Sequence, residues 1–409
     1  MIGLGLSEDL SLADATAMKF GSPSRSSIFP GDLDSKLHNH QGSHHISHTA
    51  NIIEMPADVP HTQKAFVVQD PGENYTIVLQ DNIPVSEPGP GEILIKLECT
   101  GLWYHSEVRA VLGWGVYNPI IGHEGVGTVT KVGQGVNNTS LGQRVGLKWL
   151  YNACTECSIC QRGLAHHCPK QLNTSRNVPG TLQQYAIADA RFVTPIPEAL
   201  KSEIAAPLLC AGLTMSGALA HLDSVLQPGD WVVISGSGGG LGHVGVQIAS
   251  RIKNYRVISI DSGDEKKEIS LLSGAEKFID FKTDDVPARI MELTGEGAHA
   301  TIVVPGTKEA FAMAPAVVRN LGTIVNVGLP RNDIEIPISA TVCAARGITI
   351  QGSSIGTEEQ MVELLQYASQ GIITPFIEVF EFSKVPELIH GLVHDEIKGR
   401  AVVTLPQNL

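Results

Sequence analysis

Two patterns of hydrophobic and polar positions divide the chain. From residue 64 to about 130 the apolar stretches are short and separated by turn residues, as in KAFVVQ, PGPGEILIKLECTG and GVGTVTKVG. This pattern predicts short strands and a β-rich region with the character of a partly open barrel. From about residue 212, continuous apolar runs alternate with stretches of helical spacing, which predicts a parallel sheet covered by helices.

The most regular segment runs from Trp231 to Asp261 and reads as strand, glycine turn, helix and second strand. The apolar run at 231–234 predicts a strand covered on both faces, and apolar residues at helical spacing over 244–252 predict a helix. Glycines between them allow the backbone to approach a pyrophosphate closely at the helix N-terminus. The predicted coenzyme contacts of this turn are Gly236, Gly238, Gly239, Gly240, Leu241 and Gly242. Asp261 ends the second strand, where a carboxylate accepts hydrogen bonds from a ribose, and this predicts NAD rather than NADP.

Further strand-like runs follow at 277–281, 300–306, 322–328 and 348–354. They extend the prediction to a doubly wound parallel-sheet domain over residues 212–350. Residues 61–211 and 351–409 are predicted to form the β-rich domain. The chain therefore returns to its first domain for its last sixty residues and leaves a cleft between the two.

Composition narrows the class of protein. The chain has 409 residues, of which 43% are hydrophobic and 17% charged, as in a soluble protein of two or three domains. A net charge of −13 without a Lys/Arg cluster predicts no nucleic-acid binding. Without an apolar run of about eighteen residues or a signal peptide, we expect no membrane span and a cytoplasmic protein. Residues 1–60 are rich in Ser, Asp and His and lack periodicity, which predicts a disordered extension, and Met55 resembles a natural start, so residues 1–54 are interpreted as an upstream addition.

Four cysteines lie within fifteen residues in the pattern C-x2-C-x2-C-x7-C: Cys154, Cys157, Cys160 and Cys168. Four thiolates this close in sequence can surround one tetrahedral zinc ion at about 2.3 Å, which predicts a structural site over 154–168. In a chain without a secretory signal this grouping favours metal binding over disulfides. His166 and His167 are expected at the surface because four sulfurs complete the coordination.

Residues far apart in the sequence indicate a second metal site. His123 and Glu124, which lie between two glycines, offer an imidazole ligand and a carboxylate that can enter or leave the coordination. Cys210 lies where the β-rich region meets the sheet domain, and its thiolate is expected to face the cleft. Each residue alone is more typical of a core position, and only the combination with the other motifs makes a zinc site specific.

These motifs together resemble the zinc-containing medium-chain alcohol dehydrogenases, in particular the yeast type. The resemblance rests on GHEGVG at 122–127, the four-cysteine lobe, APLLCAGLT at 206–214, the glycine turn with Asp261, and Gly399-Arg400. It covers about residues 60–409 and implies a GroES-like catalytic domain, a Rossmann coenzyme domain and a homotetramer. It also implies hydride transfer between NAD(H) and a primary or secondary alcohol or aldehyde, assisted by a catalytic zinc.

The resemblance assigns further residues by position. Lys266 would support the adenosine ribose and Arg400 the pyrophosphate, while Trp114 and Trp149 resemble the aromatic walls of a small substrate pocket. Ser106 keeps the hydroxyl that hands the alcohol proton to solvent.

The chain departs from the family at the first ligand of the catalytic zinc. The family loop reads roughly T-G-x-C-H-[ST]-[DE], whereas residues 100–107 read TGLWYHSE. This places Tyr104 at the ligand position and makes Trp103 an insertion, and Cys99 is no substitute because it lies upstream in a strand. Glu107 keeps a carboxylate near the metal. Arg109 stands where many relatives have a relay histidine, and it cannot act as a base at neutral pH.

This departure has three possible consequences. In the first, zinc persists on His123, Glu124 and Cys210, with His105 or Tyr104 moving in as a ligand. Alternatively, zinc is lost and Ser106 and Tyr104 act as proton donors. In the third case, three bases inserted into a Cys codon have produced Trp103-Tyr104. The favoured function is an NAD-dependent alcohol dehydrogenase or aldehyde reductase; the alternatives are a zinc-less member that reduces or isomerises in a specialised pathway, and a silent NAD-binding subunit.

Overall fold

The structure is a computed structural model that describes residues 59–331 and 334–407, except for the side chain of His105. The chain divides into the units Met1–Glu54 and Met55–Leu409, and all that follows concerns the second. The predictions of disorder and of an upstream addition fall on residues 1–58, outside the described part. The boundaries proposed for the two domains stay predictions.

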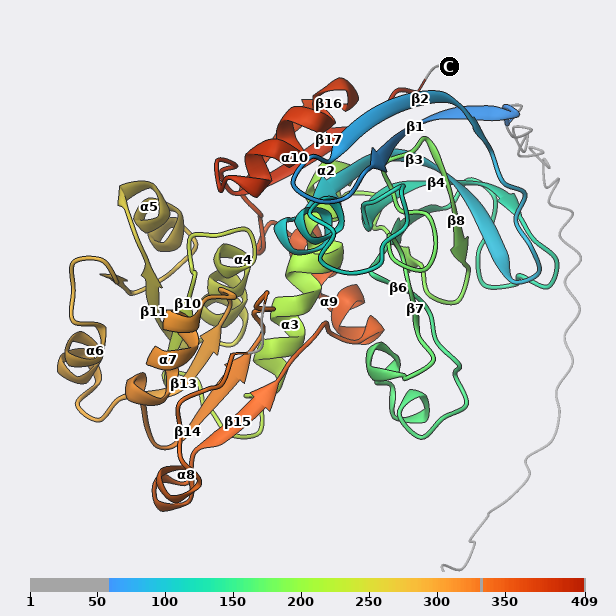
Figure 1. Cartoon of the computed structure of the whole chain (residues 1–409). Helices are drawn as coiled ribbons and strands as arrows, with labels where there is room; N and C mark the ends of the chain where they lie inside the picture. The colour runs from blue at the N-terminus through green and yellow to red at the C-terminus, as the bar shows by residue number, and fades with distance from the viewer. Residues whose placement is uncertain (1–58, 332–333, 408–409) are drawn as a thin grey trace, which may run out of the picture. The chain divides into compact units, whose positions relative to one another are not determined.

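A six-stranded parallel sheet forms from residue 231 onward, in the order β12-β11-β10-β13-β14-β15 (Figure 1). Its strands are β10 (Trp231–Ser235), β11 (Arg256–Asp261), β12 (Lys277–Asp280), β13 (Ala298–Val303), β14 (Val318–Asn326) and β15 (Thr349–Gly352). Every residue of β10 is buried, as expected for a strand covered on both faces. The strand order reverses between β10 and β13, and ligands of such sheets bind at this switch point. The predicted doubly wound sheet is confirmed.

Helices connect these strands. They are α4 (Gly242–Gln247) with its π-helical continuation η5 (Ile248–Ile252), α5 (Asp264–Leu272), α6 (Val286–Thr294), α7 (Lys308–Val317) and α8 (Ala340–Arg346). Asp285 caps α6 and Thr307 caps α7, each accepting a backbone N–H of the first turn. The glycine turn lies between β10 and α4, as the sequence predicts.

A second, seven-stranded sheet joins both ends of the described chain. Its path is β16-β17-β3-β4-β5-β9, with β8 paired to β3. The strands are β3 (Glu92–Leu102), β4 (Glu124–Val132), β5 (Arg144–Leu147), β8 (Tyr185–Asp189), β9 (Thr194–Pro195), β16 (Ile377–Glu381) and β17 (Arg400–Thr404). Gly127 allows β3 and β4 to approach closely, because a side chain there would collide with the backbone of Lys96.

The pairing of β3 with β17 on one side and with β4 on the other builds one edge of the site. Ala401 lies opposite Leu102, and Gly101 lies opposite Glu124. Arg400 and Glu124 are therefore neighbours although 276 positions separate them. Two further sheets have two strands each. They pair β1 (Thr62–Gln69) with β2 (Thr76–Pro84) and β6 (Leu150–Asn152) with β7 (Leu172–Asn173).

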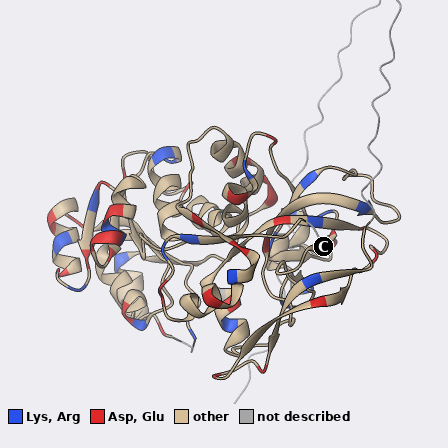
Figure 2. Cartoon of the chain, turned by 90° about the horizontal axis from the view of Figure 1, so that it is seen from above, with Lys and Arg blue, Asp and Glu red and all other residues tan. Residues whose placement is uncertain are grey.

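Three consecutive helices, α2 (Ser202–Pro207), η4 (Leu208–Gly212) and α3 (Leu213–Ala220), contact both large sheets or their helices. Ser202–Ala220 is long and apolar enough to cross a bilayer by length and composition, which the sequence reading did not anticipate. Because 78% of its most apolar window is buried inside the protein, it has the character of a core helix. Lys and Arg are interspersed with Asp and Glu over the described chain (Figure 2).

Candidate active site

His123, Glu124 and Cys210 come together in the interior. His123 precedes β4, Glu124 opens it, and Cys210 lies in the π-helical turn η4, which contacts β4. Their ligand atoms all lie within 4.8 Å of one another, and all three residues are buried. The structure thus gathers an imidazole, a carboxylate and a thiol in one group.

Ser106 and Glu107 orient His123 from behind. The Ser106 hydroxyl donates to Glu107 Oε2 (2.6 Å), and His123 Nδ1 lies 3.1 Å from Ser106 Oγ and 3.4 Å from Glu107 Oε1. The backbone N–H of Trp103 also donates to Glu107 Oε2 (3.1 Å). With its only proton committed to Glu107, the Ser106 hydroxyl accepts from His123 Nδ1–H, which leaves Nε2 as the ligand nitrogen. Ser106 is itself buried, so a proton that leaves it must pass to a neighbouring group before it reaches solvent.

The unsatisfied atoms of the group fit a metal ion. His123 Nε2 and Glu124 Oε1 are buried and accept no hydrogen bond within the described residues. Burial would lower the pKa of His123, but the adjacent Cys210 and Glu107 raise it well above its usual value, so the group favours positive charge. Nitrogen, oxygen and sulfur donors suit zinc, and three protein ligands are typical of catalytic zinc.

Arg400 joins this group to a neighbouring cavity. Arg400 is 2% exposed, and its Nη2 pairs with Glu124 Oε2. Its Nε and Nη1 find no protein partner among the described residues, although Arg400 lines the cavity. These two nitrogens are buried, so Arg400 offers an anion in the cavity its positive charge rather than exposed N–H groups.

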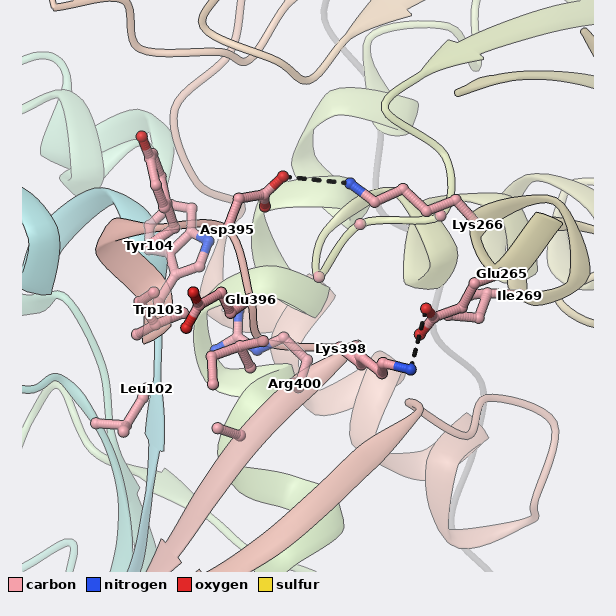
Figure 3. Close-up of a pocket in the computed structure, with 17 residues that line it drawn as sticks. Leu102, Trp103, Tyr104, Glu265, Lys266, Ile269, Asp395, Glu396, Lys398 and Arg400 are labelled. Carbon is pink, nitrogen blue, oxygen red and sulfur yellow. Dashed lines mark ion pairs between the residues drawn. The ribbon is translucent and has the colours of Figure 1, made fainter. Parts of the chain in front are cut away.

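The cavity has a volume of about 210 Å³ and lies between the glycine turn and the segment before β17 (Figure 3). Its polar lining includes Gly238, Gly239, Gly240, Lys266 and Arg400. Trp103 and Tyr104 line the side formed by the loop after β3. Backbone groups of a glycine turn opposite an arginine suit a pyrophosphate.

The other predicted coenzyme residues support the turn from inside. Asp261 Oδ2 accepts the N–H of Gly238 and Oδ1 that of Ser262, both at 2.9 Å. Gly236 adopts φ +72°, and a side chain at Gly242 would collide with Gly236, so both glycines shape the turn. Leu241 is buried in the core. None of these four lines the cavity, whereas sequence reasoning gave them direct contacts.

The loop after β3 continues into a π-helical turn, η1 (Tyr104–Val108). Tyr104 is 42% exposed, and its neighbour Trp103 packs its indole 5.8 Å from the His123 ring. Trp149 approaches the same imidazole edge-on at 5.4 Å. His105 also belongs to this turn, but its side chain lies outside the described residues. Trp103 thus places an aromatic ring against the candidate metal ligand.

Three other residues that the sequence analysis singled out, Cys99, Arg109 and Trp114, have contacts elsewhere. Cys99 is in β3, as predicted, and burial raises the pKa of its thiol. Arg109 donates to the carbonyl of Pro330 (3.5 Å), and Arg331 stacks over Trp114 at 4.4 Å.

His243 is a functional candidate that the sequence reasoning missed. Its Nε2 accepts the N–H of Phe376 (3.0 Å), so Nδ1–H donates to the carbonyl of Gly239 (2.8 Å). This neutral imidazole ties the glycine turn to the segment that leads into β16. Burial lowers its pKa to about 4. No sequence signal separates it from an ordinary helical residue.

The four lobe cysteines form a single cluster. The sulfur of Cys168 lies 3.5 Å from Cys154 and 3.9 Å from Cys157, and Cys154 lies 3.9 Å from Cys160. Ligands at about 2.3 Å around a tetrahedral zinc are about 3.8 Å apart, so the cluster fits the ion. The four thiols are free. The expectation for His166 was wrong: it is buried, while His167 is exposed.

Comparison with known proteins identifies the family. The chain is 37% identical to alcohol dehydrogenase 2 of Emericella nidulans, over 85% of this chain and 99% of that protein. It belongs to the zinc-binding alcohol dehydrogenases. The family description "Zinc-binding dehydrogenase" matches residues 240–370 of the dehydrogenase, and "Alcohol dehydrogenase GroES-like domain" matches 89–198.

Other relatives agree. The alcohol dehydrogenase of Schizosaccharomyces pombe is 36% identical over 85% of the dehydrogenase and 99% of the relative. Among solved structures, acetophenone reductase from Geotrichum candidum in complex with NAD superposes with a TM-score of 0.74 at 26% identity, covering 85% and 98% of the two chains. The predicted family, GroES-like and Rossmann fold class, NAD-dependent alcohol dehydrogenase activity and the cofactors NAD and zinc are confirmed.

Proposed function

We propose that the dehydrogenase transfers hydride between NAD(H) and a small primary or secondary alcohol or aldehyde beside the His123–Glu124–Cys210 group. The observation that carries this proposal is the pair of buried, unpartnered ligand atoms, His123 Nε2 and Glu124 Oε1, next to a thiol. These three residues would hold zinc. Zinc bound there supplies a Lewis acid that polarises the substrate oxygen.

Ser106 and Glu107 act as positioning residues in this proposal. They fix the ring plane and tautomer of His123 so that Nε2 faces the metal. Ser106 would also start the proton path of the zinc enzyme. Tyr104, partly exposed at the cavity, and His105 stay predicted as residues that can move in as a zinc ligand.

The coenzyme site is proposed in the cavity. Backbone groups of Gly238–Gly240 would bind the pyrophosphate, and the positive charge of Arg400 beside the cavity would stabilise it. Lys266, whose Nζ is 4.0 Å from Asp261, would face the adenosine ribose. Because Arg400 also contacts Glu124, coenzyme binding would bear directly on a metal ligand.

A second candidate is a zinc-less NAD(H)-dependent reductase or isomerase. The indole of Trp103 beside His123 favours it, because the loop brings a ring, and no thiol, to the imidazole. NADH oxidation with short, branched and aromatic aldehydes, measured after chelation and after zinc return, separates the two. Turnover that is lost on chelation and recovered when zinc returns supports the zinc enzyme. Turnover that chelation leaves unchanged supports the alternative.

We also propose that the dehydrogenase is a cytoplasmic homo-oligomer, a tetramer by family analogy. β15 lies at the edge of the parallel sheet, and α8 has no buried residue. Ile350 of β15 and Val342 of α8 are exposed, as is Leu321 at 78%. An unpaired edge beside apolar side chains is suited to pairing with a second copy. Light scattering gives the oligomer size, and a fluorescent fusion gives the compartment.

A further inference from the structure

A loop from the other large sheet crosses the adenosine end of the proposed coenzyme cavity. Residues 394–399 connect α10 (Val385–Val393) to β17, and most of them line the cavity. Asp395 Oδ2 lies 3.7 Å from Lys266 Nζ, and Lys398 Nζ lies 3.2 Å from Glu265. Both ion pairs are drawn in Figure 3 and tie the loop to α5. Asp395 is thereby held at the residue predicted to face the ribose.

We propose that Asp395 is a coenzyme-specificity residue, which excludes a 2′-phosphorylated dinucleotide by holding the charge of Lys266. This inference rests on the proposed coenzyme site. It adds a second acid to Asp261, the one residue that the sequence pattern offers for this selection.

Asp261 alone is poorly placed to exclude a 2′-phosphorylated dinucleotide. It is 7% exposed, both carboxylate oxygens accept backbone N–H groups, and it does not line the cavity. Asp395 does line the cavity, and its side chain is 81% exposed. The carboxylate that an incoming phosphate meets is therefore that of Asp395.

The charge balance gives the direction of the effect. Lys266 lies 4.0 Å from Asp261 and 3.7 Å from Asp395, so one ammonium faces two carboxylates and the trio carries a net charge of −1. A phosphate with about two negative charges is repelled by this trio, whereas ribose hydroxyls can donate to carboxylates. Removing Asp395 leaves Lys266 with one partner inside the turn and frees it to bind phosphate.

The backbone makes Asp395→Asn a mild substitution. Asp395 adopts φ +57°, a left-handed conformation that Asn also accepts readily. Glu396→Gln is the matched control, since Glu396 lies next in the loop and lines the same cavity. It removes the same charge without separating Asp395 from Lys266.

The test measures Kd for NADPH and NADH by fluorescence titration of the full chain at low salt. We expect Asp395→Asn to tighten NADPH binding about five- to tenfold, with NADH changed less than about twofold, and the gain to shrink at high salt. Adding Lys266→Met should abolish the gain, while Glu396→Gln should give less than half of it.

An equal gain from Glu396→Gln, or a gain that survives Lys266→Met, overturns the proposal, as does an unchanged NADPH affinity in Asp395→Asn. If Arg400→Ala and Lys266→Met each bind NADH as tightly as the wild type does, the proposed coenzyme site is refuted instead. The two failures are therefore distinguishable.

Discussion

The two candidate metal groups differ in where their ligands come from. The lobe takes four sulfurs from one segment of fifteen residues, and their spacing matches a closed tetrahedral site. The His123–Glu124–Cys210 group takes three different donors from two distant elements and leaves two buried atoms unpartnered. The first group is complete and local, as a structural ion requires. The second is open and depends on the whole fold, as a reactive ion requires.

The largest expected effect comes from breaking the open group. Cys210→Ser should lower kcat/KM for aldehyde reduction about 10³-fold, because the metal that stabilises developing charge is lost or misplaced. The free energy of unfolding should change little in comparison. Steady-state kinetics and thermal unfolding of the same preparation test this. Activity within tenfold of wild type would remove Cys210 from the proposed site.

Loss of a cysteine from the four-cysteine lobe should lower the stability of the fold more than it affects the active site. Cys157→Ser is expected to lower the free energy of unfolding by about 3 kcal/mol or more, because a structural zinc contributes directly to folding. The fraction that stays folded should keep its affinity for NADH. Denaturant unfolding and coenzyme titration provide the two readouts, and an unchanged unfolding midpoint would contradict a zinc-filled lobe.

Completing the open group sharpens the comparison. Deletion of Trp103 combined with Tyr104→Cys restores the loop of the family and should raise zinc affinity at this site at least about tenfold. Competition with a chromogenic chelator measures this. Deletion of Trp103 alone is the control, and an equal effect from it would assign the change to the indole rather than to the thiolate.

The residues behind His123 should have a smaller effect than the loss of Cys210. Glu107→Gln is expected to weaken zinc binding about ten- to a hundredfold, because the imidazole loses its oriented carboxylate partner. Ser106→Ala leaves that carboxylate in place and should cost less. Chelator competition ranks the variants, and a larger loss in Ser106→Ala would reverse the roles proposed here.

His243, a buried histidine outside the metal groups, provides a contrast confined to one range of pH. Burial holds the pKa of His243 at about 4, below its usual value near 6.5, so the unfolded chain binds the extra proton first. Stability from this group is complete above about pH 6.5 and decreases as the pH falls toward 4, by up to about 3 kcal/mol. His243→Gln should flatten this part of the stability profile. A wild-type profile without a fall over this range would contradict a neutral, buried His243.

Sequence patterns predicted what is local in this fold. The apolar runs gave the six parallel strands, and cysteine spacing gave the lobe, because neighbours in sequence remain neighbours in space. The pairing of Arg400 with Glu124 and the contact of Asp395 with Lys266 depend on β17 returning beside β3. The role of Asp261 inside the turn and the burial of Ser106 depend on side-chain packing, which no spacing rule reports.

Native mass spectrometry of the zinc content per chain tests the central claim, that the His123–Glu124–Cys210 group holds a second ion. We predict two zinc ions in the wild type, one in a His123→Ala, Cys210→Ser double variant, and one in Cys157→Ser. One zinc ion in both the wild type and the double variant would show that the lobe alone binds metal and would contradict the account.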